Sequence, residues 1–228
     1  GTALIKQALG VASATIAIED NKPEAIEHIQ KVLSELKGKS SKYDGIEVLS
    51  LMKKYPEGGE KQLIDAVMHR QVKSGGLPID VGAVVQNVAT ALAVYDAVQK
   101  NKPLIDNSVT VTGECFPKQA NLLVRVGTPL RYIVDYLGGV PESAAKIISG
   151  GPMMGKAVAN LDAATLKGTG ALLFLTAEQT KRHPEGNCIR CGKCADACPM
   201  GLEPFLLYRL AKAGNTDELE ANAVQDCI

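Results

Sequence analysis

Apolar side chains in the first hundred residues follow two spacings, one typical of strands and one typical of helices. Short β-branched and apolar runs at 12–19 and 45–52 predict two buried strands. Apolar positions three and four residues apart predict helices at 4–9, 23–36, 60–70 and 81–100, the last of them long and largely buried. Because strands and helices alternate along the chain, we expect a parallel sheet and an α/β domain.

The pattern changes at residue 108, where short apolar runs are separated by turns. The runs that predict strands are 109–112, 122–126 and 170–176. Residues 130–137 predict one short helix, and residues 150–155 form a glycine-rich turn. We therefore expect a small, strand-rich module in the middle of the chain.

The last quarter of the chain combines a cysteine run with two short helical patterns, at 202–212 and 217–223. Three modules are expected, with boundaries at 1–105, 106–176 and 177–228. The chain opens in a helix-like segment and stops one residue after Cys227, so we expect a fragment cut at both ends.

Composition and charge exclude several classes of function. Of the 228 residues, 46% are hydrophobic and 22% charged, which fits a globular chain that buries a core. Its 25 basic and 25 acidic residues cancel, so no electrostatic field favours nucleic acid. The apolar runs are too short to cross a bilayer, and no signal-peptide pattern opens the chain. We expect a soluble protein that reaches a membrane only through its partners.

Four cysteines near the C-terminus carry the most specific chemical signal. Cys188, Cys191, Cys194 and Cys198, followed by Pro199, have the spacing C-x2-C-x2-C-x3-C-P. In ferredoxin-like segments this spacing holds a 4Fe-4S cluster with the first three thiolates, and the fourth binds a second cluster. Cys227 then begins what we interpret as the second cluster motif. The sequence therefore predicts electron transfer through two clusters.

Two other uses of cysteine pairs are a zinc site and a disulfide framework. Four cysteines in eleven residues closed by proline favour the iron–sulfur interpretation over both. Free thiolates also favour the reducing cytoplasm over secretion. Cys115 stands alone in a strand-rich stretch, and we assign it no role beyond that of a small buried hydrophobe.

The candidate ligand-binding turn is Tyr55-Pro-Glu-Gly-Gly-Glu60, since neither a P-loop nor a G-x-G-x-x-G fingerprint occurs. Gly58 and Gly59 would let the backbone approach a ligand, and the helix after them would offer free amides to a phosphate or flavin edge. The alternative is a turn without any ligand, which is the commoner case. Asn87 lies within the predicted helix at 81–100, where its amide needs a partner, more often backbone than cofactor. The three histidines share no metal-ligand spacing and are interpreted as surface residues.

Five segments together resemble the RnfC family, whose members are the C subunits of Rnf-type electron transport complexes. These are Lys54–Ile64, Ser74–Pro78, Val84–Leu92, Gly151–Gly155 and the cysteine run, in the family's order. The family is similar in turn to the flavin- and NADH-binding subunit of respiratory complex I. The resemblance implies a partial complex-I-type flavin-binding α/β domain, then a β-grasp domain of the SLBB type, then a helical ferredoxin-like iron–sulfur segment.

The resemblance also implies site residues. In the complex I relative, a Tyr-x-x-Gly-Glu-Glu turn and an Asn-Val-Glu-Thr segment line the flavin and NADH pocket. The matching positions here are Tyr55, Gly58, Glu60, Asn87 and Thr90, whereas Gly59 and Ala89 replace acidic residues. The family's upstream glycine-rich flavin loop is absent from this sequence, so we expect the fragment alone to be inactive.

For the intact subunit, the resemblance implies a peripheral protein on the cytoplasmic side of a bacterial membrane. It would exchange electrons between NAD(H), FMN and two 4Fe-4S clusters, with electrons derived from ferredoxin and ion pumping by other subunits. Cys188, Cys191 and Cys194 would hold the first cluster with a cysteine beyond residue 228, and Cys198 and Cys227 would belong to the second. Two alternatives stay open: a cobalamin reductase of the same superfamily, and a non-catalytic assembly scaffold with a vestigial pocket.

Overall fold

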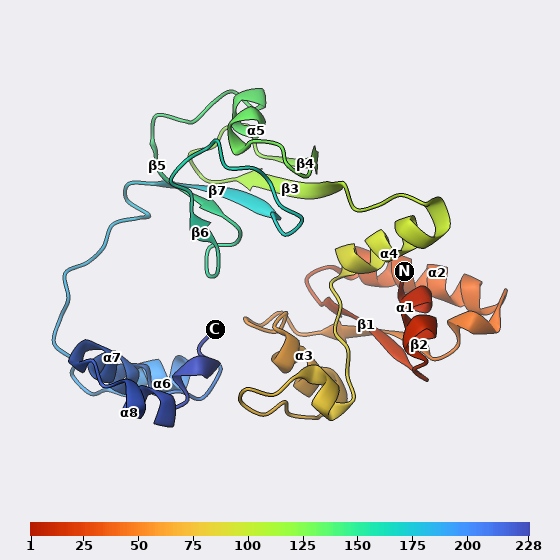
Figure 1. The fold of residues 1–228 in the computed structure, drawn as a ribbon, viewed down its shortest axis with the longest axis horizontal. Helices are drawn as coiled ribbons and strands as arrows, with labels where there is room; N and C mark the ends of the chain where they lie inside the picture. The colour runs from red at the N-terminus through yellow and green to blue at the C-terminus, as the bar shows by residue number, and fades with distance from the viewer. The chain divides into compact units, whose positions relative to one another are not determined.

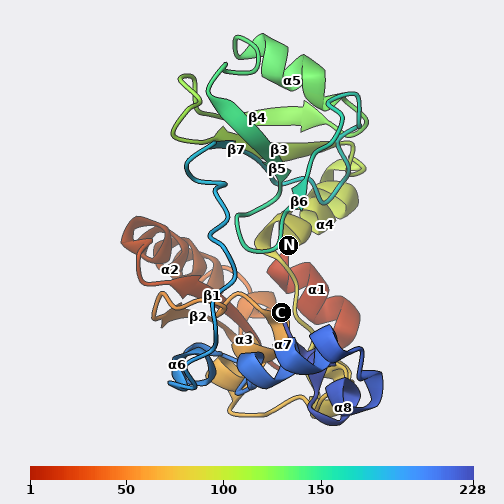
Figure 2. The same cartoon turned by 90° about the vertical axis from the view of Figure 1, so that its left-hand side faces the viewer.

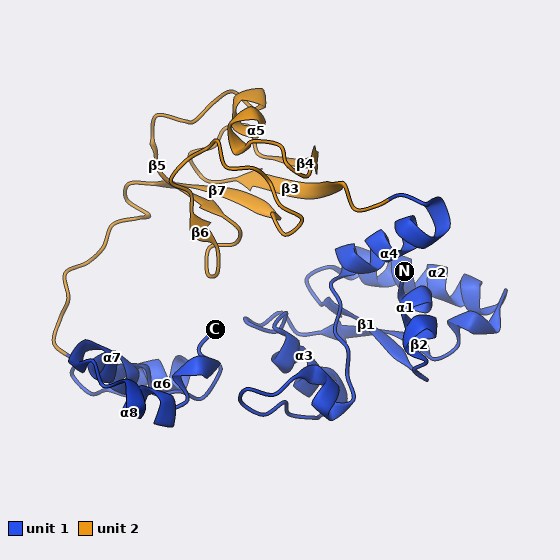
Figure 3. Ribbon diagram, viewed as in Figure 1, with its two compact units in different colours: residues 1–102, 188–228 blue, residues 103–187 orange.

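The computed structural model describes residues 1–228 and divides into two compact units (Figure 3). Unit 1 comprises Gly1–Lys102 together with Cys188–Ile228, and unit 2 comprises Pro103–Asn187. No helix in either unit combines the length and the apolar character that a bilayer span requires.

The first part of unit 1 is an α/β arrangement, as the spacing predicted (Figure 1). Its elements are α1 (Thr2–Leu9), β1 (Ala14–Glu19), α2 (Pro23–Lys37), η1 (Ser41–Tyr43), β2 (Ile46–Leu51), α3 (Glu60–Met68), η2 (Pro78–Val81) and α4 (Val88–Lys100). Strands β1 and β2 pair in parallel, with Ala14 opposite Ile46 and Glu19 opposite Leu51. The predicted parallel sheet is therefore confirmed for these two strands, which α2 connects.

The prediction of one long, buried helix over 81–100 is wrong in two respects. The short helix η2 ends at Gly82, whose φ of 73° is left-handed, and regular helix resumes only at Val88. Asn87 sets that start, because its side-chain Oδ1 accepts a hydrogen bond from the Ala89 amide at 2.8 Å. No residue of α4 is fully buried, and Val88 is 68% exposed.

The cysteine-bearing part of unit 1 is helical. It contains α6 (Lys193–Ala197), α7 (Pro204–Ala213), α8 (Thr216–Ala221) and η3 (Val224–Asp226). The two helices predicted at 202–212 and 217–223 are confirmed to within about two residues, whereas α6 was not predicted. Pro204 begins α7, and Gly214 ends it with a left-handed φ of 68°.

Unit 2 is a mixed five-stranded sheet with one helix, the arrangement expected of a β-grasp domain (Figure 2). Its elements are β3 (Asp106–Thr112), β4 (Ala120–Arg125), α5 (Leu130–Tyr136), β5 (Ala144–Ser149), β6 (Lys156–Ala157) and β7 (Ala171–Thr176). The strand order is β4-β3-β7-β5-β6, in which only β3 and β7 are parallel. The sequence pattern missed β5 and β6.

One face of this sheet forms the core of unit 2. Phe116 and Phe174 are buried, with ring centroids 4.5 Å apart. Ile133 and Val134 of α5 belong to the same buried cluster, so the helix covers that face. Leu123 is 74% exposed, because alternation along β4 directs it away from the core that holds Val124.

Candidate functional site

The predicted flavin turn lies between β2 and α3 and is held by its own backbone. The amide of Glu57 donates to the carbonyl of Lys54 at 2.7 Å, and the amide of Gly59 donates to that of Pro56 at 2.6 Å. The Tyr55–Pro56 peptide bond is cis, and Tyr55 is 52% exposed. These bonds shape the turn without using the tyrosine ring, which leaves that ring accessible to a ligand.

The two glycines of this turn have different surroundings. A Cβ on Gly59 would collide with the side-chain carbonyl of Gln62 and lie 3.0 Å from the carbonyl of Pro56. A Cβ on Gly58 would meet no protein atom within 4 Å, and Gly58 does not have a left-handed φ. Internal packing therefore explains Gly59 but not Gly58. The open space at Gly58 is where a ligand could approach the backbone.

Helix α3 begins directly after this turn. Gly59 is its N-cap and offers no side-chain cap, so the amides of the first turn lack that partner. Glu60 lies exposed in the first turn. A helix start with uncapped amides suits an anionic or carbonyl edge of a ligand.

Asn87 and Thr90 lie at the start of α4. The side chain of Asn87 caps the helix, so its amide oxygen already has a backbone partner, as the ligand-free interpretation expected. Thr90 is exposed in the first turn of α4. The candidate flavin residues thus occupy two helix starts, and their assignment to a cofactor stays a prediction.

The six cysteines are all free thiols. Cys188 and Cys191 precede α6, Cys194 lies in it, and Cys198 follows its last residue, while Cys227 follows η3. Arg190 and Gly192 have left-handed φ values of 55° and 77°, which turn the chain sharply between the thiols.

No three of the Cys, His, Asp or Glu side chains are gathered in a metal-binding arrangement. The donor set is nevertheless the soft thiolate set that iron–sulfur clusters use, closely spaced and largely exposed, so its chemistry fits the predicted clusters. The five ligand assignments stay predictions. Cys115 is different, because it is partly buried against the core of unit 2.

Helix α3 also contacts the cysteine-bearing segment. Lys61 Nζ lies 3.8 Å from Asp226 Oδ1, and Gln62 Nε2 lies 2.7 Å from Met200 Sδ. Sequence reasoning missed Lys61 and Gln62, because no local pattern connects residues so far apart in the chain.

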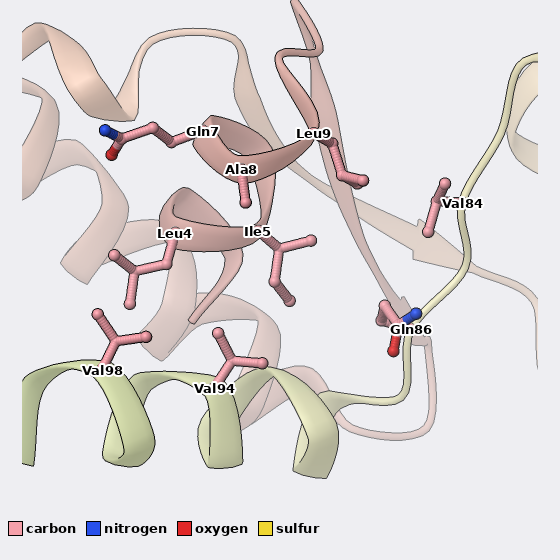
Figure 4. Close-up of a pocket in the computed structure, with 9 residues that line it drawn as sticks. All are labelled: Leu4, Ile5, Gln7, Ala8, Leu9, Val84, Gln86, Val94 and Val98. Atoms are coloured by element: carbon pink, nitrogen blue, oxygen red, sulfur yellow. The ribbon is translucent and has the colours of Figure 1, made fainter. Parts of the chain in front are cut away.

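An apolar hollow of about 630 Å³ lies elsewhere in unit 1, between α1 and α4 (Figure 4). Leu4 and Ile5 of α1 face Val94 and Val98 of α4 across it. Its lining includes side-chain amides but no acid, base or thiol. The hollow therefore offers no group for redox or acid–base chemistry.

The ion pairs that shift pKa values lie outside the candidate turn. Lys100 Nζ lies 2.8 Å from Asp96 Oδ1 at the end of α4, and this hydrogen bond lowers the pKa of Asp96. In unit 2, the guanidinium of Arg131 similarly lowers the pKa of Asp162. The histidines at 28, 69 and 183 are exposed, which confirms their interpretation as surface residues.

Comparison with protein families gives three matches in chain order. Residues 1–96 match the family described as "Nuo51 FMN-binding domain", residues 108–157 match "SLBB domain", and residues 183–202 match "4Fe-4S binding domain". The fold class predicted from the sequence is thereby confirmed.

Three curated relatives, all C subunits of ion-translocating complexes, illustrate the closer similarity. That of the proton-translocating ferredoxin:NAD(+) oxidoreductase complex of Clostridium ljungdahlii is 45% identical over 212 residues, which are 93% of this chain and 45% of the relative. That of the Na(+)-translocating complex of Acetobacterium woodii is 39% identical over 226 residues, 99% of this chain and 49% of the relative. That of the ion-translocating oxidoreductase complex of Rhodobacter capsulatus is 39% identical over 217 residues, 95% of this chain and 41% of the relative.

The chain spans somewhat less than half the length of these relatives. Over that span, the fold, the order of the three matched families and the sequence identity agree. The chain therefore belongs to the RnfC family, the C subunits of ion-translocating oxidoreductase complexes.

Proposed function

We propose that the intact subunit is the electron-transfer subunit of a membrane-associated ferredoxin:NAD oxidoreductase. It exchanges electrons between NAD(H), FMN and two 4Fe-4S clusters, as a part of an ion-translocating complex. One observation carries the proposal: a turn with an open glycine position and a C-x2-C-x2-C-x3-C-P run occur in one chain of this family.

The residues of the turn would bind and orient the flavin. Gly58 leaves room for a ring or phosphate edge against the backbone, and the first amides of α3 donate hydrogen bonds to it. Tyr55 and Glu60, both exposed beside this opening, would face the flavin and nicotinamide. Asn87 and Thr90 would contribute from the start of α4. When bound, FMN exchanges two electrons with NAD(H) and single electrons with iron–sulfur centres.

The thiols would hold the clusters. Cys188, Cys191 and Cys194 supply three ligands of one cluster, while Cys198 and Cys227 supply ligands of the other. The remaining ligands come from outside these residues. Because thiolates bind iron only when deprotonated, loading would also order this segment.

The partners would be the other subunits of the complex, with electrons derived from ferredoxin and NAD(H) as the soluble substrate. We place the subunit peripherally at the cytoplasmic side of the membrane, since free thiols and NAD(H) belong to a reducing compartment. Membrane attachment would then depend on contacts with those other subunits.

Anaerobic cluster reconstitution of the intact subunit tests this function. We expect about eight irons per chain, bound FMN, and bleaching of the visible spectrum by NADH. Cys191→Ser should lose about four of these irons, whereas Cys115→Ala, the matched control, should keep them all. Full iron content without FMN or any NADH response would instead identify a relay or scaffold.

A further inference from the structure

The first turn of α3 contacts the cysteine-bearing segment at two points. Lys61 Nζ lies 3.8 Å from Asp226 Oδ1 and also donates to the carbonyl of Lys73 at 3.2 Å. One residue further on, Gln62 Nε2 contacts Met200 Sδ. Two consecutive side chains of the helix that follows the flavin turn therefore hold two separate parts of the cysteine segment.

These contacts are partly shielded from water. The side chains of Lys61 and Asp226 are 33% and 18% exposed, whereas Lys22 and Glu19, an ion pair of equal length, are 59% and 40% exposed. Gln62 and Met200 are both half-buried. Shielding strengthens the attraction between charges, and the second bond to Lys73 restricts the ammonium group further.

Both contacts flank predicted ligands of the same cluster. Met200 lies two residues after Cys198, and Asp226 lies one residue before Cys227. In the ferredoxin pattern, the fourth cysteine of one run and the first of the next belong together. The other three cysteines, at 188, 191 and 194, are exposed.

We propose that Lys61 and Gln62 are positioning residues that dock the Cys198–Cys227 cluster beside the flavin turn. That cluster then exchanges electrons with the flavin, and the cluster of Cys188, Cys191 and Cys194 lies one step further along the path. This inference rests on the proposed function. In the NADH-oxidising direction, one NADH becomes NAD⁺ and one proton, and its two electrons leave the flavin singly, one reducing each cluster.

Carbodiimide coupling of the reconstituted intact subunit tests the docking. The reagent joins an ammonium and a carboxylate that are in contact, so peptide mass spectrometry should find an amide between Lys61 and Asp226. Lys22 and Glu19, also 3.8 Å apart, serve as the internal control. Coupling of the control pair without coupling at Lys61, or coupling of Lys61 to Asp196 instead, would overturn the assignment.

Rapid mixing with NADH tests the consequence. The variant Lys61→Met with Gln62→Leu should bleach its flavin at the parent rate, but its clusters should be reduced about tenfold more slowly. Iron and FMN contents should match the parent, and Lys31→Met, an exposed lysine of α2, should change neither rate. Cluster reduction at the parent rate would overturn the proposal.

The two proposals fail in different ways. A parent protein that holds its clusters but binds no FMN contradicts the proposed function, and the coupling map then still decides where the segment docks. A parent protein that reduces its clusters with NADH, but shows neither the Lys61–Asp226 amide nor a slowed variant, contradicts the docking alone.

Discussion

At the scale of single residues, Gly58 and Gly59 show how a glycine can be separated from its neighbour by its surroundings. Gly59 is required by the fold, because a side chain there would press on Gln62 and Pro56. Gly58 faces open space, so the folded chain tolerates a methyl group at this position. A reason for glycine at 58 must then come from outside the chain.

We predict that Gly58→Ala weakens FMN binding to the intact subunit without weakening its fold. The added methyl group would occupy the space of the ligand, so the Kd for FMN should rise about tenfold, or about 1.4 kcal/mol. The free energy of unfolding should change by less than about 0.5 kcal/mol, because nothing in the chain is displaced. Fluorescence titration of FMN and urea unfolding provide the two measurements.

Gly168→Ala is the matched control, since its Cβ would also meet nothing within 4 Å and it lies in unit 2. It should leave both the FMN affinity and the stability unchanged. Equal FMN affinities of the Gly58→Ala variant and the parent would show that this turn does not contact the flavin.

Asn87 marks what sequence can and cannot predict about a residue. The sequence predicted correctly that its amide would find a backbone partner, since buried or helical amides need one. It placed that partner inside a helix instead of at the helix start, because the apolar residues from 81 onward continue the helical spacing without interruption. The capping preference of asparagine was the available signal.

At the scale of elements, unit 2 depends on contacts between α5 and one face of its sheet. Phe174 of β7 is fully buried against Phe116, among residues of β3, β4 and α5. Phe174→Ala should lower the free energy of unfolding of unit 2 by about 3–5 kcal/mol, since it leaves a large cavity. Leu123→Ala, on the exposed face of β4, should cost less than about 0.5 kcal/mol. Hydrogen exchange at the β3 and β7 amides would measure both changes, and equal costs would contradict the described core.

A second contact joins α5 to the segment after β6. Arg131 Nε donates to Asp162 Oδ1 at 2.8 Å, and this bond lowers the pKa of the Asp162 carboxyl. Because the folded pKa is depressed, the contribution is fully present above the unfolded pKa of about 4 and is lost as the pH falls through the lower folded value.

We therefore predict that Asp162→Asn destabilises unit 2 slightly at pH 7 and has no effect once the pH lies below the folded pKa. The effect is small because the two side chains are 53% and 63% exposed. Urea midpoints of the variant and the parent across that range would measure it. A difference that persists unchanged at the lowest pH would show that the carboxylate charge is not responsible.

Elements with strong local signals were predicted well, and those defined by tertiary partners were not. Helix α2 and strands β1 and β2 have complete apolar patterns and were found within about two residues. Strand β6 has only two residues and exists through its pairing with β5, while α6 is a five-residue helix inside the cysteine run. Neither length leaves a periodic pattern to detect.

At the scale of the whole molecule, the two units differ in what stabilises them. The core of unit 2 consists entirely of its own residues, between 109 and 174. In the segment 188–228, only Leu202 is buried, although four short helices occur there. Sequence order suggested a separate third module at 177–228, and those boundaries stay a prediction. The contacts of Lys61 and Gln62 with this segment could not be predicted, because they join residues more than a hundred positions apart.

This difference predicts how the intact subunit responds to loss of iron. Helices as short as α7 are marginal on their own, so cluster bonds would supply the free energy that folds the segment. Chelation of iron should speed tryptic cleavage at Arg209 and Lys212 about tenfold or more. Cleavage at Arg125 and Lys146, in strands of unit 2, should keep its rate, because that core contains no predicted cluster ligand. Mass spectrometry of timed digests distinguishes the two regions. If α7 resists trypsin equally with and without iron, its own packing stabilises it and the cysteines do not control its folding.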